Sequence, residues 1–431
     1  MTYKQAMDYI EIVNQYGSVL GLESMERLLT YFGHPEEELS FVHVAGTNGK
    51  GSTIAFLATA LEKGKYRVGR YSSPVVQSYC ERIQINGKSI PKKSLADYME
   101  RVKEACESIV EEGYPHPTAF EVETVIGFLY YIEKKCDLVL LETGLGGVLD
   151  ATNVIPPPMV AIITSISRDH MAVLGNTIEE IATAKAGIIK TGCHVVTYDQ
   201  GEEICKVIEK QCEKELAILH SVSLEDCMHY RQMKTKQGFT YKEWKNLQIT
   251  LLGRHQVTNA LLALEALEVL ENCGFAVSKE AIYEGFYETK WFGRLTQISK
   301  KPLIYVDGAH NADSVAKLSE AVVAYFQGKQ LICLVGMFRD KECEEAMRRI
   351  APLATHLITL TPPDQERSLH GYELAQIAQN YHKSVTVADS VQEALEIACL
   401  LADQDTVILA FGSLSYLGTL QEILSDMKRN L

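Results

Sequence analysis

Residues 46–52 (GTNGKGS) constrain the fold more than any other part of this 431-residue chain. The apolar run 41–45 before them predicts a buried strand, and the apolar spacing of residues 53–63 after them predicts a helix. A strand, a glycine-rich turn and a helix can cradle a phosphate, because backbone N–H groups and the helix N-terminus face the anion while Lys50 adds a full charge. The sequence therefore predicts a phosphate-binding loop; a plain surface turn rich in Gly and Ser is the alternative.

The spacing of this loop departs from the common P-loop pattern G-x-x-x-x-G-K-[ST]. Val44 stands where the first glycine would fall, and Gly51 separates Lys50 from the hydroxyl of Ser52. The departure points away from the common P-loop ATPases and toward a phosphate loop of a different spacing.

The bulk composition excludes several classes of partner and site. The net charge of −14 disfavours nucleic acid, whose phosphates require a basic surface. The eleven cysteines contain no C-x-x-C pair, which indicates reduced thiols and no zinc site. The N-terminus lacks the order of a signal peptide, and apolar runs such as 125–132 are too short to span a bilayer. We therefore expect a cytoplasmic protein without a nucleic-acid or membrane partner.

The alternation of strand and helix patterns predicts an α/β fold with two domains. Residues 1–293 should form a P-loop ATPase-like doubly wound sheet with N-terminal helices, and residues 294–431 a Rossmann-like, mostly parallel sheet, with a hinge at 291–294. Residues 194–250 alternate shorter strands and helices to which we assign no function. The expected strands are 41–45, 65–70, 137–142 and 159–165, then 303–307, 330–335, 356–360, 384–388 and 405–411.

Three polar side chains follow expected strands of the first domain, where a doubly wound sheet gathers its site. Mg2+ prefers oxygen ligands, so the Ser73 hydroxyl and the Glu142 carboxylate suit it. A carboxylate that meets water or caps the turn is the alternative for Glu142. Imidazole favours softer metals, so chemistry alone favours reading His170 as a loop histidine with satisfied hydrogen bonds.

Lys185 lies in an unusually apolar stretch, residues 183–189 (TAKAGII). Physics alone favours a lysine whose stem lies along the core while its ammonium group reaches water. The alternative is a buried amine with a lowered pKa, which could act as a nucleophile, including toward carbon dioxide.

The second half holds fewer candidate residues. Asp307, in DGAHN, follows a strand and opens a helix, which predicts a turn that faces a ligand. Asn259 lies near the start of the expected helix 254–270 and Arg294 lies in the hinge. A polar helix face and a surface charge are the plain alternatives for these last two.

Ordered motifs along the whole chain resemble those of one enzyme family. The sequence is similar to the folylpolyglutamate synthase/dihydrofolate synthase enzymes of the Mur-ligase superfamily from about residue 18 to about residue 420. GTNGKGS alone would indicate only the superfamily, whereas ERIQING, TAFE and GLGGVLDATN narrow the resemblance to the folate branch. The other motifs are SSP, SISRDH, AKAGIIK, HQVTNA, WFGR, DGAHN and GSLSYLG.

The resemblance implies a role for each matched residue. Ser73, Glu142 and His170 would bind two Mg2+ ions, which replaces the chemical interpretation of His170. Lys185 would be carbamylated to N6-carboxylysine, and Lys50, Lys185 and His170 would be the catalytic groups. ATP would contact Asn48, Gly49, Lys50, Gly51, Ser52, Asn259, Arg294 and Asp307, with His310 close by. The pterin-bearing substrate would contact Arg82, in the loop 75–84, and Thr118 and Phe120.

The chain departs from the family pattern at a few positions. Ala184 stands where Glu commonly precedes the modified lysine, and Phe292 stands where the hinge commonly has Pro. The turn GMFRDKE does not end in Asp, and Ser415 precedes Tyr416. None of these removes an implied ligand, so they bear on substrate detail and hinge stiffness.

The resemblance implies an ATP-dependent ligase that adds L-glutamate to a folate through an acyl phosphate, giving ADP and phosphate. Tetrahydrofolate is the expected acceptor, the use of dihydropteroate as a second acceptor stays open, and we expect a monomer. Two alternatives stay open at this point. One is a Mur-type ligase that acts on a cell-wall nucleotide precursor. The other is a P-loop kinase or nucleotide switch, which would leave the second domain unexplained.

Overall fold

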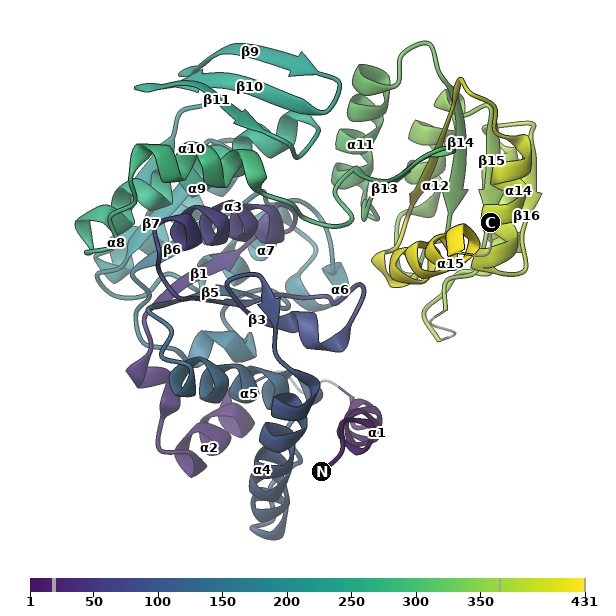
Figure 1. Cartoon of the computed structure of the whole chain (residues 1–431). Helices are drawn as coiled ribbons and strands as arrows, with labels where there is room; N and C mark the ends of the chain where they lie inside the picture. The colour runs from purple at the N-terminus through teal and green to yellow at the C-terminus, as the bar shows by residue number, and fades with distance from the viewer. Residues whose placement is uncertain (18–20, 364–365, 430–431) are drawn as a thin grey trace. The chain divides into compact units, whose positions relative to one another are not determined.

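The computed structural model describes residues 1–17, 21–363 and 366–429. The chain forms two compact units, each described here by itself (Figure 1). The predicted domain limits, 1–293 and 294–431, stay a prediction. Unit 1 comprises Met1–Tyr230, Phe239–Gln248 and Thr258–Thr289, and unit 2 comprises Arg231–Gly238, Ile249–Val257 and Lys290–Leu431.

Unit 1 is built on a sheet whose strand order, within the described residues, is β4-β3-β2-β5-β1-β6-β7-β8. Parallel pairing joins the neighbouring strands β2, β5, β1, β6, β7 and β8. At the β2 edge, β3 and β4 extend the sheet with antiparallel pairing. Both β1 (FVHVA) and β5 (LVLLE) are buried along their whole length, as expected for parallel strands covered on both faces. The strands are β1 Phe41–Ala45, β2 Val68–Tyr71, β3 Ile83–Ile85, β4 Lys88–Ser89, β5 Leu138–Glu142, β6 Val160–Ile163, β7 His194–Tyr198 and β8 Ile218–Val222.

The register of these strands determines which loops meet. Val44 of β1 lies opposite Glu142 of β5, and Ala45 lies opposite Ile163 of β6. Tyr71 of β2 lies opposite Leu141 of β5. Because parallel strands end at the same edge of a sheet, the loops after β1, β2, β5 and β6 share one edge. That edge is where the candidate site is built.

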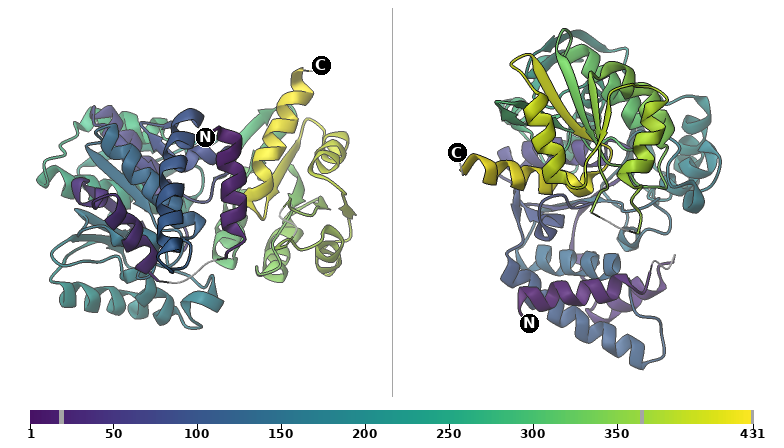
Figure 2. Two further views of the ribbon diagram at one scale, coloured as in Figure 1. Left: turned by 90° about the horizontal axis from the view of Figure 1, so that it is seen from below. Right: turned by 90° about the vertical axis from the view of Figure 1, so that its right-hand side faces the viewer.

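Helices cover both faces of the unit 1 sheet (Figure 1). α3 contacts β1, β2 and β5 and packs against α10, while α5 lies on the opposite face against β2. The N-terminal helices α1 and α2 pack on α4 and α5, so the purple and blue helices lie together in Figure 2. The helices are α1 Tyr3–Asn14, α2 Glu23–Tyr31, α3 Lys50–Lys63, α4 Lys92–Glu111, α5 Ala119–Glu133, α6 Met171–Leu174, α7 Ile178–Ala186, α8 Glu202–Glu215, α9 Arg254–Asn272 and α10 Lys279–Glu288.

The second strand of unit 1 lies later than its predicted range of 65–70. Lys65 has a left-handed backbone (φ 70°), and its N–H donates to Glu62. Tyr66 donates to Leu61, so residues 64–66 close the end of α3. The strand therefore begins only at Val68.

The segment 194–250 contains β7, α8 and β8 and then a three-stranded sheet of order β11-β10-β9. Its residues divide between the two units. α9 likewise begins in unit 2 and continues in unit 1. The strands are β9 Cys227–Met233, β10 Lys236–Tyr241 and β11 Trp244–Ile249.

Unit 2 contains a second sheet, of order β12-β13-β17-β14-β15-β16 within the described residues. All its pairs are parallel except β12 with β13, so the predicted α/β class with a mostly parallel second sheet is confirmed. The edge strand β12 and the helix α10 were not predicted. The elements are β12 Thr296–Lys300, β13 Leu303–Val306, α11 Ala312–Tyr325, β14 Gln330–Val335, α12 Cys343–Ile350, β15 His356–Thr359, α13 Gly371–Gln379, β16 Val385–Val387, α14 Val391–Leu401, β17 Thr406–Phe411 and α15 Leu417–Arg429.

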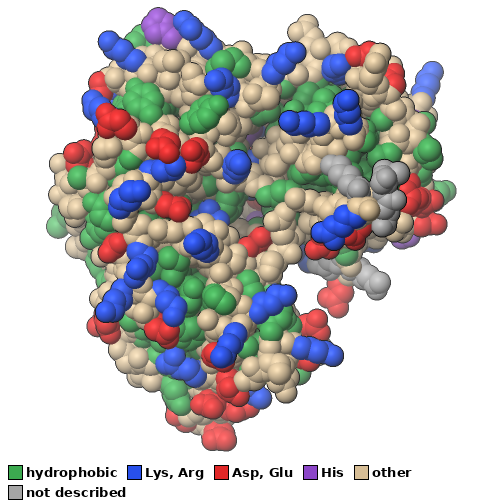
Figure 3. Space-filling view, in the orientation of Figure 1, with side chains coloured by type: hydrophobic (Ala, Val, Ile, Leu, Met, Phe, Trp, Pro, Cys, Tyr) green, Lys and Arg blue, Asp and Glu red, His purple; other side chains and the backbone are tan. Residues whose placement is uncertain are grey.

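The surface carries charges of both signs. On the face in view in Figure 3, acidic and basic side chains are interspersed over unit 1. Across residues 1–17, 21–363 and 366–429, no helix has both the length and the apolar composition needed to cross a bilayer.

Candidate active site

The phosphate loop follows β1, and two of its glycines are required by close neighbours. A Cβ on Gly46 would lie 1.9 Å from the Thr164 hydroxyl oxygen, and one on Gly49 would lie 2.4 Å from the Asn259 amide oxygen. Gly49, with φ 94°, precedes α3, whose first turn has no side-chain cap. The backbone N–H groups at the start of α3 therefore remain suited to an anion, as the sequence predicted.

Lys50 and Lys185 donate to the same carbonyl oxygen. The Nζ of each lies 3.0 Å from the Gly46 oxygen, and Lys50 Nζ also lies 3.4 Å from the Thr47 oxygen. Lys185 is only 4% exposed, so the interpretation in which its ammonium group reaches water is wrong. Its partner is a loop carbonyl beside the phosphate site.

Burial, and to a lesser extent the charge of Lys50, lower the pKa of Lys185 to about 7. Asp169 and Asp150 act in the opposite direction and raise the pKa. A substantial fraction of Lys185 is therefore a neutral amine near pH 7, which is the form that can attack carbon dioxide.

This burial predicts a measurable effect on stability. In the unfolded chain the lysine pKa is about 10.4, so between about pH 7 and this value the unfolded state holds more protons. Stability then rises with pH through that window, and below it the charged, buried amine destabilises the fold. In CO2-free buffer, Lys185→Met is expected to melt at a higher temperature than the parent at about pH 6, and this rise should be smaller at about pH 9. Each kcal/mol of added stability corresponds to a rise of about 3 °C. Thermal unfolding at both pH values tests this, and a variant less stable than the parent at the lower pH contradicts it.

Ser73 and Glu142 lie together at the ends of the neighbouring strands β2 and β5. The Ser73 N–H donates to Glu142 Oε2 at 3.3 Å, and Glu142 is 4% exposed. A hydroxyl and a buried carboxylate beside a phosphate loop form the oxygen donor set that Mg2+ prefers. The residues therefore fit this ion.

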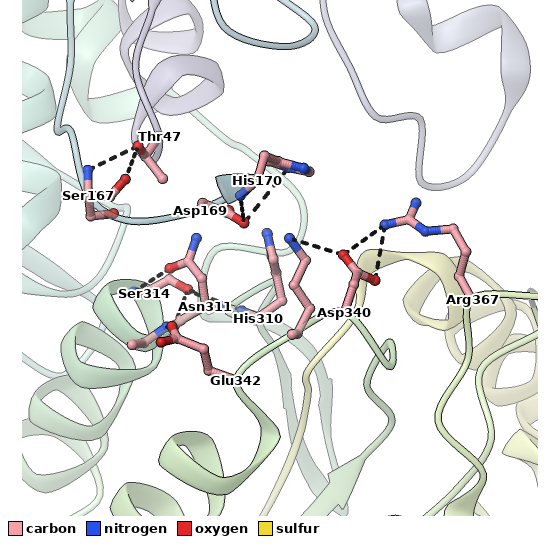
Figure 4. A network of polar contacts seen from close by, with 12 residues as sticks. Thr47, Ser167, Asp169, His170, His310, Asn311, Ser314, Asp340, Glu342 and Arg367 are labelled. Atoms are coloured by element: carbon pink, nitrogen blue, oxygen red, sulfur yellow. Dashed lines mark hydrogen bonds and ion pairs between the residues drawn. The ribbon is translucent and has the colours of Figure 1, made fainter. Parts of the chain in front are cut away.

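His170 follows β6 and caps the short helix α6 (Figure 4). Its N–H donates to Asp169 Oδ1 at 2.9 Å, and its Nε2 lies 3.9 Å from the same oxygen. The His170 side chain is 41% exposed, whereas that of Asp169 is 10% exposed. Asp169 was not among the predicted site residues, although its place in the motif SISRDH is a usable signal.

The glycine-rich turn after β5 is held by a buried chain of hydrogen bonds, whose residues were not among the predicted site residues either. Asp150 accepts from the N–H of Leu145 at 2.7 Å and from that of Thr152 at 3.0 Å. The Thr152 hydroxyl donates to Asp150, so His43 Nε2, 2.8 Å away, must be the donor to that hydroxyl. Asp150 thus fixes the turn that begins two residues after Glu142.

The same turn packs against the end of α7. The Val148 N–H donates to the Ala184 oxygen at 2.9 Å, and a Cβ on Gly147 would lie 2.7 Å from that oxygen. The backbone of Ala184 therefore helps to hold the neighbouring Lys185 in place.

The residues expected to contact the pterin already have partners within the protein. Arg82 Nε lies 2.9 Å from Glu123 Oε2, and both side chains are largely buried. The Thr118 hydroxyl caps α5, and the Phe120 ring packs on Tyr71 with centroids 5.8 Å apart. A Cβ on Gly144 would lie 2.6 Å from the Phe120 ring, so this cluster contacts the turn after Glu142.

Unit 2 contains the remaining candidates. Asp307 is buried and accepts from the N–H groups of Leu295, at 2.7 Å, and Ala309, at 2.8 Å. Burial raises the pKa of Asp307, while the Arg294 charge lowers it. Arg294 Nη1 donates to Gly293, and His310 Nδ1 lies 2.7 Å from the Gly308 oxygen. Arg294, Asp307 and His310 are thus gathered at the turn after β13, whereas Asn259 lies beside the phosphate loop of unit 1.

Comparison with known proteins gives the family. Residues 44–267 match the family described as Mur ligase middle domain, and residues 293–414 match Mur ligase, glutamate ligase domain. The chain is 34% identical over 437 aligned positions to the dihydrofolate synthase/folylpolyglutamate synthase of Bacillus subtilis, covering 100% of this chain and 99% of that protein. The chain belongs to the folylpolyglutamate synthase/dihydrofolate synthase family of Mur ligases.

Solved structures of this ligase family have the same fold. The Mycobacterium tuberculosis folylpolyglutamate synthase, complexed with ADP and AMPPCP, superposes with a TM-score of 0.89 at 26% identity, covering 98% of each chain. Escherichia coli FolC, in complex with DHPP and ADP, superposes with a TM-score of 0.85 at 26% identity, covering 99% of this chain and 98% of that one. The predicted membership of the folate branch of the Mur ligases is therefore confirmed.

Proposed function

We propose that this protein is an ATP-dependent ligase that joins the amine of L-glutamate to a carboxylate of a folate, giving ADP and phosphate. The observation that carries the proposal is the meeting of the phosphate loop, Lys50, Lys185 and the Ser73–Glu142 pair at one edge of the unit 1 sheet. The folate specificity is supported by similarity to ligases named for folate substrates over the full length of the chain.

The first chemical step transfers the γ-phosphoryl group of ATP to a folate carboxylate. A bond forms between a carboxylate oxygen and phosphorus while the bond to the ADP oxygen breaks. Lys50 and the N–H groups that begin α3 stabilise the negative charge spread over the phosphoryl oxygens. The glutamate amine then attacks the acyl carbon, the amine loses a proton, and phosphate leaves. Arg294 and Asp307 stay proposed nucleotide contacts.

Ser73, Glu142 and His170 are the residues that would hold Mg2+, as two ions. When bound, the metal supplies positive charge to the phosphate oxygens. The chain's own contribution is the buried Glu142 carboxylate, fixed by the Ser73 N–H.

Lys185 is the proposed site of carbamylation. Its Nζ would form a bond to the carbon of CO2 and release a proton, which converts a neutral amine into an anionic carbamate. We expect a 13C-carbamate NMR signal when the protein is equilibrated with 13CO2, because burial lowers the pKa of Lys185 to about 7. The signal should be absent from Lys185→Met. A signal of equal intensity in that variant would rule out Lys185 as the modified residue.

The acceptor is tested by measuring ADP release with ATP and L-glutamate while tetrahydrofolate and dihydropteroate are offered separately. We expect turnover that requires both glutamate and a folate acceptor, and the two arms report whether the enzyme is bifunctional. A rate of ADP release that does not change when either acceptor is added would contradict the proposal. Turnover with UDP-linked acceptors alone would instead favour a cell-wall ligase, and a phosphorylated product without amide formation would favour a kinase. The expectation of a monomer stays a prediction.

A further inference from the structure

The phosphate loop is joined to the segment after β6 by hydrogen bonds donated from each of the two segments to the other. The N–H groups of Thr47 and Asn48 both donate to the Ser165 oxygen, at 2.7 and 3.3 Å. The Ser165 hydroxyl donates back to the Asn48 oxygen at 3.4 Å, and the two residues form an isolated antiparallel bridge. The loop that would hold ATP and the segment that leads to His170 therefore lie against each other.

The Thr47 side chain extends this connection by two residues (Figure 4). Its hydroxyl donates to the Ser167 oxygen at 3.0 Å and accepts from the Ser167 N–H at 3.0 Å. Both bonds are to one residue, and the hydroxyl's single proton is used in the bond that it donates to the Ser167 oxygen. Asp169 and His170 lie two and three residues after Ser167 in the chain, separated from it by Arg168. The Thr47 hydroxyl is thus hydrogen-bonded within the protein. By fixing Ser167, it fixes the start of the short segment that leads to Asp169 and His170.

Gln200, which follows β7, holds the same segment from its other side. Its Oε1 accepts from the Ile166 N–H at 2.7 Å, and its Nε2 donates to the Thr164 oxygen at 3.1 Å. Thr164 is also the residue against which Gly46 packs. Residues 164–167 are therefore braced between the phosphate loop and the end of β7.

We infer that the Thr47 hydroxyl is a positioning group that couples the phosphate loop to the loop carrying Asp169 and His170. Both of its hydrogen bonds are to Ser167, so it acts through that residue. Because neighbours of metal ligands fix ligand orientation, loss of this hydroxyl should weaken metal binding without removing any ligand. The inference rests on the proposed function in one respect, the assignment of His170 as a metal ligand.

The test compares Thr47→Val, which keeps the shape but loses both hydrogen bonds, with Thr47→Ser, which keeps the hydroxyl. The readout is Mn2+ affinity, measured by electron paramagnetic resonance in the presence of AMPPCP. We expect Thr47→Val to bind Mn2+ about 10-fold more weakly. AMPPCP affinity in EDTA should be unchanged, and Thr47→Ser should restore Mn2+ binding.

Two further variants keep the test decisive. Thr59→Val makes the same chemical change within α3, where the Thr59 hydroxyl donates to Ala55 at 2.8 Å, and should bind Mn2+ as the parent does. Gln200→Leu removes the opposite brace and should weaken Mn2+ binding even if Thr47→Val does not fold. Unchanged Mn2+ affinity in folded Thr47→Val or in folded Gln200→Leu would overturn the inference. So would an equal loss of AMPPCP affinity in EDTA, or a Thr47→Ser variant as weak as Thr47→Val. The readout requires no turnover, so failure of the folate assignment would be seen separately.

Discussion

Replacing Lys50 by Met is expected to lower kcat for ADP formation about 1,000-fold, the scale reached when a preorganised charge at a transition state is removed. The Lys50 ammonium group donates to the Gly46 and Thr47 oxygens of its own loop, at 3.0 and 3.4 Å. These hydrogen bonds place its charge at the phosphate loop. Methionine has a side chain of similar length but brings no charge.

The matched control for this variant is Lys63→Met, at the last residue of the same helix. Lys63 forms surface ion pairs with Glu284 and Glu288 at 2.5 and 2.7 Å. Exposed pairs of this kind contribute about 0–1 kcal/mol, so kcat should match that of the parent. Steady-state ADP release from both variants measures the effect. A Lys50→Met enzyme with more than about a tenth of parental kcat would be inconsistent with a transition-state role.

The second large effect is expected at Glu142. Glu142→Gln retains the shape and an oxygen for the Ser73 N–H but removes the charge from a buried strand end. We expect kcat to fall about 100-fold and the Mg2+ concentration for half-maximal rate to rise. Excess Mg2+ should recover part of the activity, since the other donors remain.

The control for Glu142→Gln is Glu107→Gln, which neutralises an exposed carboxylate paired with Lys103 on α4. Its rate and Mg2+ dependence should equal those of the parent. Titration of Mg2+ against initial rate distinguishes the two variants. An unchanged Mg2+ requirement in Glu142→Gln would exclude Glu142 as a metal ligand.

Much of the framework was predictable because its signals are local. The apolar run of β1, the glycines of the phosphate loop and the apolar spacing of α3 adjoin one another in the chain. The strand alternation of unit 2 follows the same rule. Elements without a strong apolar run were missed. The edge strand β12 (TQISK) is largely polar, and α10 (KEAIYEGFYE) has a narrow apolar face.

The local environment of several site residues could not be predicted, because it depends on contacts between distant parts of the chain. A helical lysine has the same sequence pattern whether it reaches water or, as Lys185 does, the Gly46 carbonyl. Similarly, the sequence around Arg82 does not indicate that its buried partner is Glu123. The sequence alone gives the Thr47 hydroxyl no special role, because its partner, the Ser167 oxygen at 3.0 Å, is brought to it only by the fold.

The most direct test of the proposed ligase chemistry follows oxygen from folate to phosphate. Tetrahydrofolate labelled with 18O in its terminal carboxylate would be converted with ATP and L-glutamate, and the released phosphate analysed by mass spectrometry. Attack of the carboxylate on ATP predicts one 18O atom in each phosphate, since the acyl carbon–oxygen bond breaks when glutamate enters. Phosphate free of 18O, with glutamylated folate still formed, would contradict activation of the folate carboxylate by phosphoryl transfer.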